Sequence, residues 1–197
     1  MAKPSKSIKT KFVSQINEII WKYKLSPETT NLETRDGFTE IQVFEVTLRE
    51  PELDNTVMMA IDKAIPYPIF YRLLYEGQTK RVAAYKRPAA DSSGKWVMET
   101  YFETDWTKDI APATTLPVAL DMKTLYEQML FAYIDFPVRT GENLDILVER
   151  IKMIRKCRLD LRALETKMKS EKQFNRKVEL NAQLRELKAR LMEFTKA

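Results

Sequence analysis

The stretch that decides the fold is residues 69–87, which read IFYRLLYEGQTKRVAAYKR. Two apolar and aromatic runs flank the pair Glu76-Gly77, which is typical of a tight hairpin turn. Residues 69–76 and 80–87 are therefore predicted to form two antiparallel strands. With a loop of two or four residues, alternate side chains share one face of the hairpin. That face holds Ile69, Tyr71, Leu73, Val82 and Ala84.

Two further segments predict strands before and after this hairpin. Residues 38–49 are rich in β-branched and aromatic residues, and apolar side chains fall on both faces, which indicates a central strand covered on each side. Residues 95–103 follow a predicted loop at 88–94. They place Trp96, Met98 and Phe102 on one face. The expected result is a small mixed, mainly antiparallel sheet of about four strands.

Helices are predicted before, between and after these strands. Residues 6–24 carry apolar residues at spacings of three and four, which predicts one N-terminal helix. Residues 54–64 and 121–134 show the same period, with Asp54 and Asp121 as candidate N-caps. A loop is expected at 105–119. The fold class is therefore α+β, with helices covering the sheet.

The C-terminal part of the chain has a helical pattern of its own, free of Gly and Pro beyond Glu142. Its last segment repeats apolar residues with a coiled-coil period: Leu180, Leu184, Leu187, Leu191 and Phe194. Ser170 and Gln173 form a candidate capping box, which indicates a second helix starting there. We expect an α+β body over residues 1–140 and a helical coiled-coil extension over 141–197. The extension would fold back as an antiparallel hairpin, or continue as a rod that pairs between chains.

Composition excludes several classes of protein. The 197 residues contain no histidine and a single cysteine, which excludes histidine-based catalysis, cysteine-rich zinc modules and an internal disulfide. No apolar run approaches the length of a membrane span, and the N-terminal segment lacks the apolar core of a secretory signal. We therefore expect a cytoplasmic protein that does not contact membranes. No phosphate-binding glycine loop is present, and no cofactor or metal is expected.

The net charge of +5 is distributed unevenly along the chain. Residues 1–24 carry +5, residues 25–140 carry −6, and residues 141–197 carry +6. Basic ends attract nucleic acid, or they dock on an acidic protein surface. Both interpretations remain open at this stage.

Glu45 is the candidate catalytic carboxylate, because it lies on the expected central strand among apolar residues. In a metal-dependent nuclease, such a carboxylate would hold Mg²⁺ together with others. However, no predicted strand has the carboxylate-x-Lys spacing of such sites. The alternative is a structural ion pair with a neighbouring Lys or Arg.

A second group of candidates is basic and aromatic. Side chains of this kind alternate on the other face of the predicted hairpin and in the N-terminal helix, where they would contact nucleic acid. They are Arg72, Arg81, Tyr85 and Arg87 of the hairpin, and Lys9 and Lys11 of the helix. The alternative for the hairpin is a solvated face, or one packed under a helix with the arginine stems extended along it.

Several segments together resemble a known family over nearly the whole chain. They are residues 21–29 (WKYKLSPET), 41–48 (IQVFEVTL), 61–67 (IDKAIPY), 75–77 (YEG), 85–86 (YK), 101–106 (YFETDW) and 171–181 (EKQFNRKVELN). This set resembles the prokaryotic domain-of-unknown-function family 4391. Members of that family tend to be encoded near helicases and DNA methyltransferases of restriction-like defence loci. The resemblance implies a role beside DNA-processing machinery and supplies no catalytic residues.

The expected function is that of a non-enzymatic accessory or assembly protein in a DNA-processing or phage-defence complex. The coiled-coil extension would make the protein contacts, and the resemblance implies a helicase or methyltransferase as partner. One alternative is a nucleic-acid-binding module that uses the basic N-terminal helix and the hairpin face. The other is a divergent metal-dependent nuclease built around Glu45.

Overall fold

The structure is a computed structural model that describes residues 5–89, 95–109 and 115–196. The chain forms two compact units, residues 1–135 and residues 136–197. The expected loops at 88–94 and 105–119 fall partly outside the described residues, at 90–94 and 110–114.

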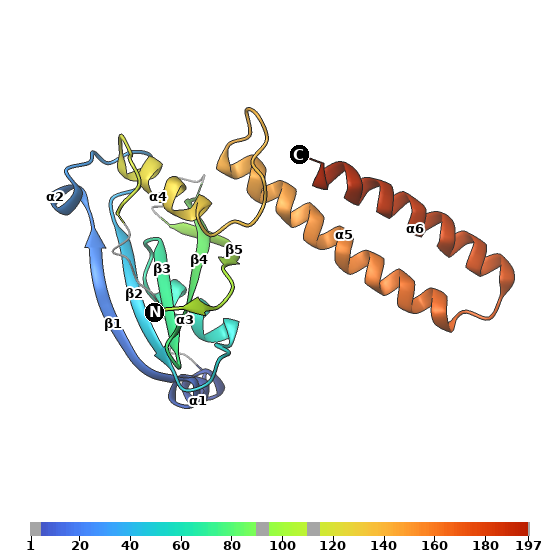
Figure 1. The fold of residues 1–197 in the computed structure, drawn as a ribbon, viewed down its shortest axis with the longest axis horizontal. Coiled ribbons are helices and arrows are strands. Elements are labelled where there is room, and N and C mark those ends of the chain that lie inside the picture. The colour runs from blue at the N-terminus through green and yellow to red at the C-terminus, as the bar shows by residue number, and fades with distance from the viewer. Residues whose placement is uncertain (1–4, 90–94, 110–114, 197) are drawn as a thin grey trace. The chain divides into compact units, whose positions relative to one another are not determined.

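Among the described residues, the first unit is built around a sheet of six strands. Figure 1 shows this sheet. The strands are β1 (Ile16–Leu25), β2 (Ile41–Leu48), β3 (Ile69–Tyr75), β4 (Gln78–Pro88), β5 (Trp96–Glu103) and β6 (Thr107–Lys108). The order is β1-β2-β3-β4-β5, and β6 pairs with β4. Of the strand pairs named here, β2 and β3 run parallel and the others are antiparallel. The predicted mixed, mainly antiparallel α+β fold is confirmed, with more strands than expected.

The predicted N-terminal helix over 6–24 is wrong in its second half. Helix α1 (Lys6–Gln15) ends where β1 begins, and β1 pairs with β2 along its length. Residues 17–24 are exposed, so the sequence of this strand does not have to alternate apolar and polar residues. The helical spacing of its apolar residues therefore did not indicate its secondary structure. Isoleucine, tryptophan and tyrosine are also weak helix formers that favour strands.

Helices cover both faces of the sheet. On one face, Val57 and Met58 of α3 (Asn55–Ala64) pack with sheet residues into a buried core. On the other face, Tyr126 of α4 (Met122–Phe131) stacks on Phe38 with ring centroids 5.0 Å apart. The predicted caps are confirmed: the Asp54 and Asp121 carboxylates accept hydrogen bonds from the first turns of α3 and α4. A single turn, α2 (Pro27–Thr30), follows β1.

The predicted hairpin is confirmed as β3 and β4, joined by the two-residue turn Glu76-Gly77. Both turn residues have positive φ, 44° and 72°, which matches the twist of a type I′ turn. The expected face of β5 is wrong at Met98. The β4–β5 register skips one residue between Met98 and Thr100, and this bulge places Met98 beside Tyr101 instead of Phe102.

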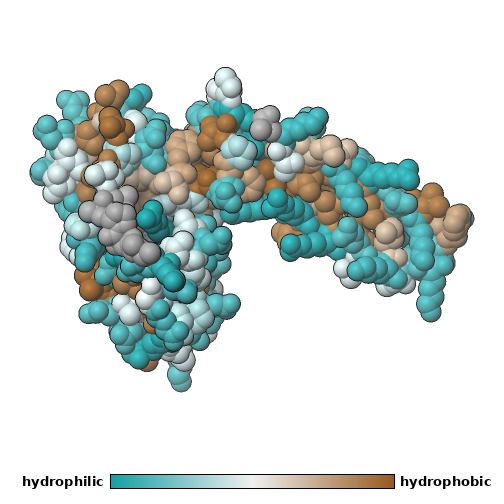
Figure 2. All heavy atoms as spheres, viewed as in Figure 1, coloured by the Kyte–Doolittle hydropathy of each residue, from teal (hydrophilic) through white to brown (hydrophobic). Residues whose placement is uncertain are grey.

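The second unit is the helical hairpin, formed by α5 (Leu144–Ser170) and α6 (Phe174–Thr195). The predicted antiparallel hairpin is confirmed (Figure 1). The predicted capping box is wrong: Ser170 is the last residue of α5, and Gln173 makes no side-chain cap. The Glu171 carboxylate accepts the free N–H groups of Lys172 and Gln173 instead, at 2.8 and 2.9 Å. Figure 2 shows apolar side chains along the line where the two helices meet, between charged flanks.

Candidate functional site

Glu45 lies on β2, on the sheet face opposite α3, and its side chain is largely buried. Its Oε2 accepts a hydrogen bond from Nη1 of Arg72 at 2.8 Å, and the Lys22 ammonium lies 3.9 Å from its Oε1. Arg72 also contacts Asp109. Among the described residues, no group of three or more His, Cys, Asp or Glu is placed to hold a metal ion. The surroundings of Glu45 are those of an ion pair.

The basic residues of the β-hairpin are only partly brought together. Arg72 and Arg81 lie directly opposite each other on β3 and β4. Arg87 donates to Oε1 of Glu99 at 2.8 Å. Tyr85 is buried, so its ring does not offer a surface on which a base could stack. Arg72 and Arg87 thus have acidic partners within the chain, which reduces their attraction for phosphate.

The two N-terminal lysines lie on α1 and have different surroundings. Lys9 is exposed. Lys11 contacts the Asp54 carboxylate, the N-cap of α3, and so joins α1 to α3. The hydrogen bonds from Lys11 and Thr56 lower the pKa of Asp54 to about 2. Lys22 and Lys24, in the second half of the predicted N-terminal helix, lie on β1 instead.

Sequence reasoning missed a buried charged site centred on Lys86 of β4, whose side chain is 1% exposed. Its ammonium lies 2.8 Å from Oδ1 of Asp62 and donates to the backbone carbonyls of Asp62, Ile65 and Tyr67 at 2.8 to 3.2 Å. The hydroxyl of Tyr101 donates to Oδ2 of Asp62 at 2.5 Å. Burial lowers the pKa of Lys86, although Asp62 acts in the opposite direction.

The geometry of this site is that of an anchor between α3 and the sheet. Four oxygens surround an ammonium that has three N–H donors, and three of these oxygens are carbonyls at or just beyond the C-terminal end of α3. A cation at this end also interacts favourably with the helix dipole. The sequence did indicate that Lys86 is buried, because strand alternation places it on the same face as the apolar residues Val82 and Ala84.

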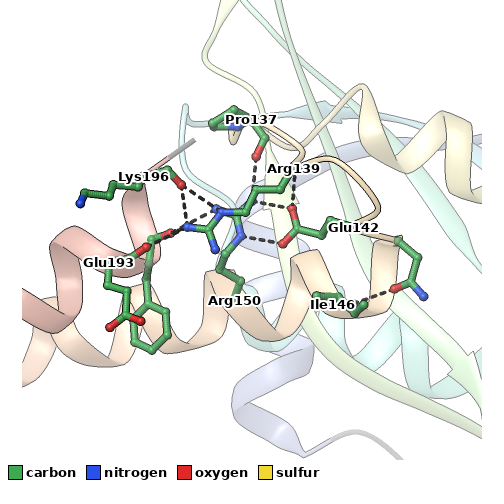
Figure 3. A network of polar contacts seen from close by, with 9 residues as sticks. Pro137, Arg139, Glu142, Ile146, Arg150, Glu193 and Lys196 are labelled. Atoms are coloured by element: carbon green, nitrogen blue, oxygen red, sulfur yellow. Dashed lines mark hydrogen bonds and ion pairs between the residues drawn. The ribbon is translucent and has the colours of Figure 1, made fainter.

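In the second unit, two arginines close the open end of the helical hairpin (Figure 3). Arg139 donates to the carbonyls of Glu193, Phe194 and Lys196 at 2.6 to 3.0 Å. These carbonyls have no partner within the helix, because they belong to the last turn of α6 and its end. Arg150 forms a bidentate ion pair with Glu142, at 2.6 and 2.7 Å. The pair lowers the pKa of Glu142 and raises that of Arg150.

The residues of the predicted coiled-coil seam all belong to α6, which packs against α5. Leu180 and Leu184 are buried, whereas Leu187, Leu191 and Phe194 are half-buried. The seam is therefore used mainly inside the helical hairpin.

A shallow hollow lies beside the arginine closure, and we name it the Ile146–Met153 hollow. Its apolar wall is formed by Ile146, Met153 and Phe194, and its charged rim includes Arg139 and Glu149. Ile146 and Met153 are 54% and 47% exposed. Sequence reasoning missed this surface, because its residues come from α5, from the end of α6 and from the segment before α5.

Comparisons with known proteins give one match. A family model described as Domain of unknown function (DUF4391) matches residues 1–191, which is nearly the whole chain. No curated protein and no solved structure matches. Among the described residues, no helix is both long and apolar enough to cross a bilayer.

Proposed function

The chain belongs to the Domain of unknown function (DUF4391) family, and we propose its function from the surfaces of the chain itself. It is a non-enzymatic accessory protein that docks a protein partner through its helical hairpin. The observation that supports this most is the Ile146–Met153 hollow. Ile146 and Met153 are seven residues apart on α5, about two helical turns, so they lie on the same side of the helix. Both remain half exposed although α5 packs against α6.

The chemistry of the hollow suits a protein partner. An apolar wall with a charged rim is typical of the contact surface of a protein complex. The rim carries both signs of charge, from Arg139 and Glu149, and the arginine closure holds the surrounding backbone in place. The matching surface would insert an apolar side chain and present charges of both signs around it.

The class of the partner comes from the family resemblance. We assign it as the helicase or methyltransferase of a cytoplasmic DNA-processing or phage-defence complex. In this proposal the chain contributes assembly, and its partner performs the chemistry.

The test is co-purification with the products of the neighbouring genes from the native operon. Ile146→Glu and Met153→Glu place a charge in the hollow at positions that already contact solvent, so the fold should tolerate them. Each should weaken binding at least about tenfold, because burying an unpaired charge in an interface is costly. Leu159→Glu is the matched control, since Leu159 lies on the same helix, is 64% exposed and does not line the hollow. Equal binding by all three variants would contradict the proposal.

A second candidate function, nucleic-acid binding, is supported by the tip of the helical hairpin. Between Lys167 and Lys177, five basic residues and one acidic residue surround Phe174, which is 77% exposed. The acidic residue, Glu171, is already engaged with backbone N–H groups. Exposed cations with an exposed aromatic ring can bind a phosphate backbone and stack a base.

This second function predicts affinity for single-stranded DNA that falls linearly on a log–log plot against salt. Lys172→Glu with Arg176→Glu should reduce both the affinity and the slope of that plot. The control is Arg185→Glu with Arg190→Glu, which makes the same change in charge at exposed positions farther along α6. Equal losses in both variants would mean that the tip has no special role.

A further inference from the structure

Strand β1 forms one edge of the sheet (Figure 1). Most of its side chains are exposed. No strand of the described residues lies beyond it, and residues 17–24 are all exposed. Four large apolar side chains, Ile19, Ile20, Trp21 and Tyr23, are between 39% and 59% exposed. By contrast, most residues of β5 at the other edge are half-buried. A long, apolar, open edge is a template for pairing with another strand.

We propose that β1 pairs in antiparallel fashion with β1 of a second copy of this chain, about a two-fold axis at Ile20. The two sheets would then form one continuous sheet across the dimer. The faces and charges of β1 support this dimer, which is independent of the function proposed for the helical hairpin.

The pairing of β1 with β2 determines which β1 side chains share a face. Ile19 and Trp21 lie opposite Val46 and Phe44, on the face covered by α3. Ile20 lies opposite Glu45, and Glu18 opposite Thr47, on the other face. A two-fold axis perpendicular to the sheet keeps each residue on its own face, and directly opposed residues must share a face.

These conditions select one register. With the axis at Ile20, this residue lies opposite its own copy, and Ile19 lies opposite Trp21 of the second copy on the α3 face. Glu18 then lies opposite Lys22 of the second copy, so the two charged pairs have opposite signs. An axis at Ile19 would place Glu18 opposite Ile20. An axis at Trp21 would place Ile19 opposite Tyr23, which lies on the other face because it pairs with Val43.

Two features that usually protect an edge strand are weakened in β1. Lysines on an edge repel a second copy. Here the Lys22 ammonium lies 3.9 Å from Glu45, and that of Lys24 lies 3.1 Å from Glu40. Bulges disturb pairing, but the run Glu18–Trp21 pairs with β2 without a shift, and Lys22 falls in the bulge that follows this run. A regular segment at the centre of the edge is thus left for pairing.

Disulfide trapping tests the register directly in the full chain. Ile20→Cys, in a Cys157→Ala background, places two thiols opposite each other, at a Cβ distance of about 5 Å. Mild oxidation should convert most of the protein into a covalent dimer. Tyr23→Cys is the control, because it is more exposed, yet the two copies would lie about 20 Å apart in this register. Equal trapping at both positions would reflect random collision and would overturn the proposal.

A charge swap tests the pairing without cross-linking. Sedimentation of the wild-type chain should give twice the mass of one 23.1 kDa chain. Glu18→Lys should weaken the dimer roughly tenfold, because like charges then face each other across the interface. Lys22→Glu should weaken it at least as much, because the new carboxylate also faces Glu45 of its own chain. The double variant should restore it, which no role inside a single chain would produce. Circular dichroism would verify that each variant is folded.

A monomer at every soluble concentration would overturn the proposal. The edge of β1 would then be available for pairing with a strand of another protein. A dimer in which the double variant is not restored would overturn the register. A dimer without Ile20→Cys trapping would place the interface elsewhere.

Discussion

Individual charges in this protein are matched where burial makes an unmatched charge costly. Lys86 and Asp62 are both almost fully buried, and each has several polar neighbours. Replacing one partner of such a pair leaves the other as an unpaired buried charge, which lowers the free energy of unfolding strongly. Replacing both partners lowers it far less. The pair is therefore best tested by single and double substitutions.

The first prediction concerns Lys86. Lys86→Met retains the volume of the side chain but leaves the Asp62 carboxylate without its cation, so the free energy of unfolding should fall by about 3–5 kcal/mol. Urea denaturation measures the loss. The double variant with Asp62→Asn should recover part of it, because the remaining amide still accepts from Tyr101. If the double variant is as unstable as Lys86→Met, the cost comes from the three carbonyls at the end of α3 instead.

The second prediction concerns Asp54, whose pKa of about 2 lies below its ordinary value of 3.8. The unfolded chain takes up this proton at a higher pH than the folded chain. The stabilisation is therefore present above about pH 4 and is lost as the pH falls toward 2. Asp54→Asn keeps an N-cap but cannot titrate, so its free energy of unfolding should fall less than that of the wild type between pH 5 and pH 2. If the free energy of unfolding changes equally with pH in the wild type and in Asp54→Asn, the Lys11–Asp54 pair contributes nothing to stability.

At the scale of elements, the last turn of α6 depends on residues outside that helix. Arg139 donates to three of its terminal carbonyls, and Arg150 donates to Phe194 at 3.2 Å. A guanidinium satisfies several carbonyls at once because its five donors are held in one plane. The end of α6 should therefore unwind when this contact is removed.

The third prediction is that Arg139→Ala accelerates hydrogen exchange in residues 191–195, with a local loss of about 1–2 kcal/mol. Arg139→Lys should rescue it only in part, since one ammonium cannot reproduce the planar fork. Arg185→Ala, at an exposed position in the middle of α6, serves as the control. An equal acceleration in the control would show that Arg139 is not the closing residue.

At the scale of the whole molecule, each unit has buried residues of its own. The sheet of the first unit has a core on the α3 face and an aromatic group of Phe38, Phe70 and Tyr126 on the α4 face. All of these residues precede residue 136, which begins the second unit. The first unit therefore contains what an independent fold requires.

The fourth prediction is that residues 1–135 fold alone. The fragment should keep the near-ultraviolet circular dichroism of its buried aromatic residues and should unfold cooperatively in urea. Loss of the aromatic signals with retention of far-ultraviolet signals would mean that residues 136–197 complete its packing. The full chain is the reference for both measurements.

Local patterns in the sequence determined much of this protein. Glu76-Gly77 specifies the β-hairpin because both positions tolerate the positive φ of its turn. Asp54 and Asp121 mark the starts of α3 and α4, because a carboxylate at that position satisfies a free N–H group. The leucine period of α6 required a partner helix, and α5 supplies it. Each of these signals acts within a few residues or along one helix face.

Tertiary structure alone decided the rest. β1 is a strand because β2 offers it a hydrogen-bonding edge, although its apolar spacing fits a helix. Lys86 meets Asp62, and Arg139 meets the end of α6, across 24 and more than 50 residues of chain. Such pairs obey no local period, because they form only after the elements that carry them have packed together. The Ile146–Met153 hollow and the open edge of β1 follow from the same packing, so the surfaces proposed to bind partners could not be predicted from the sequence.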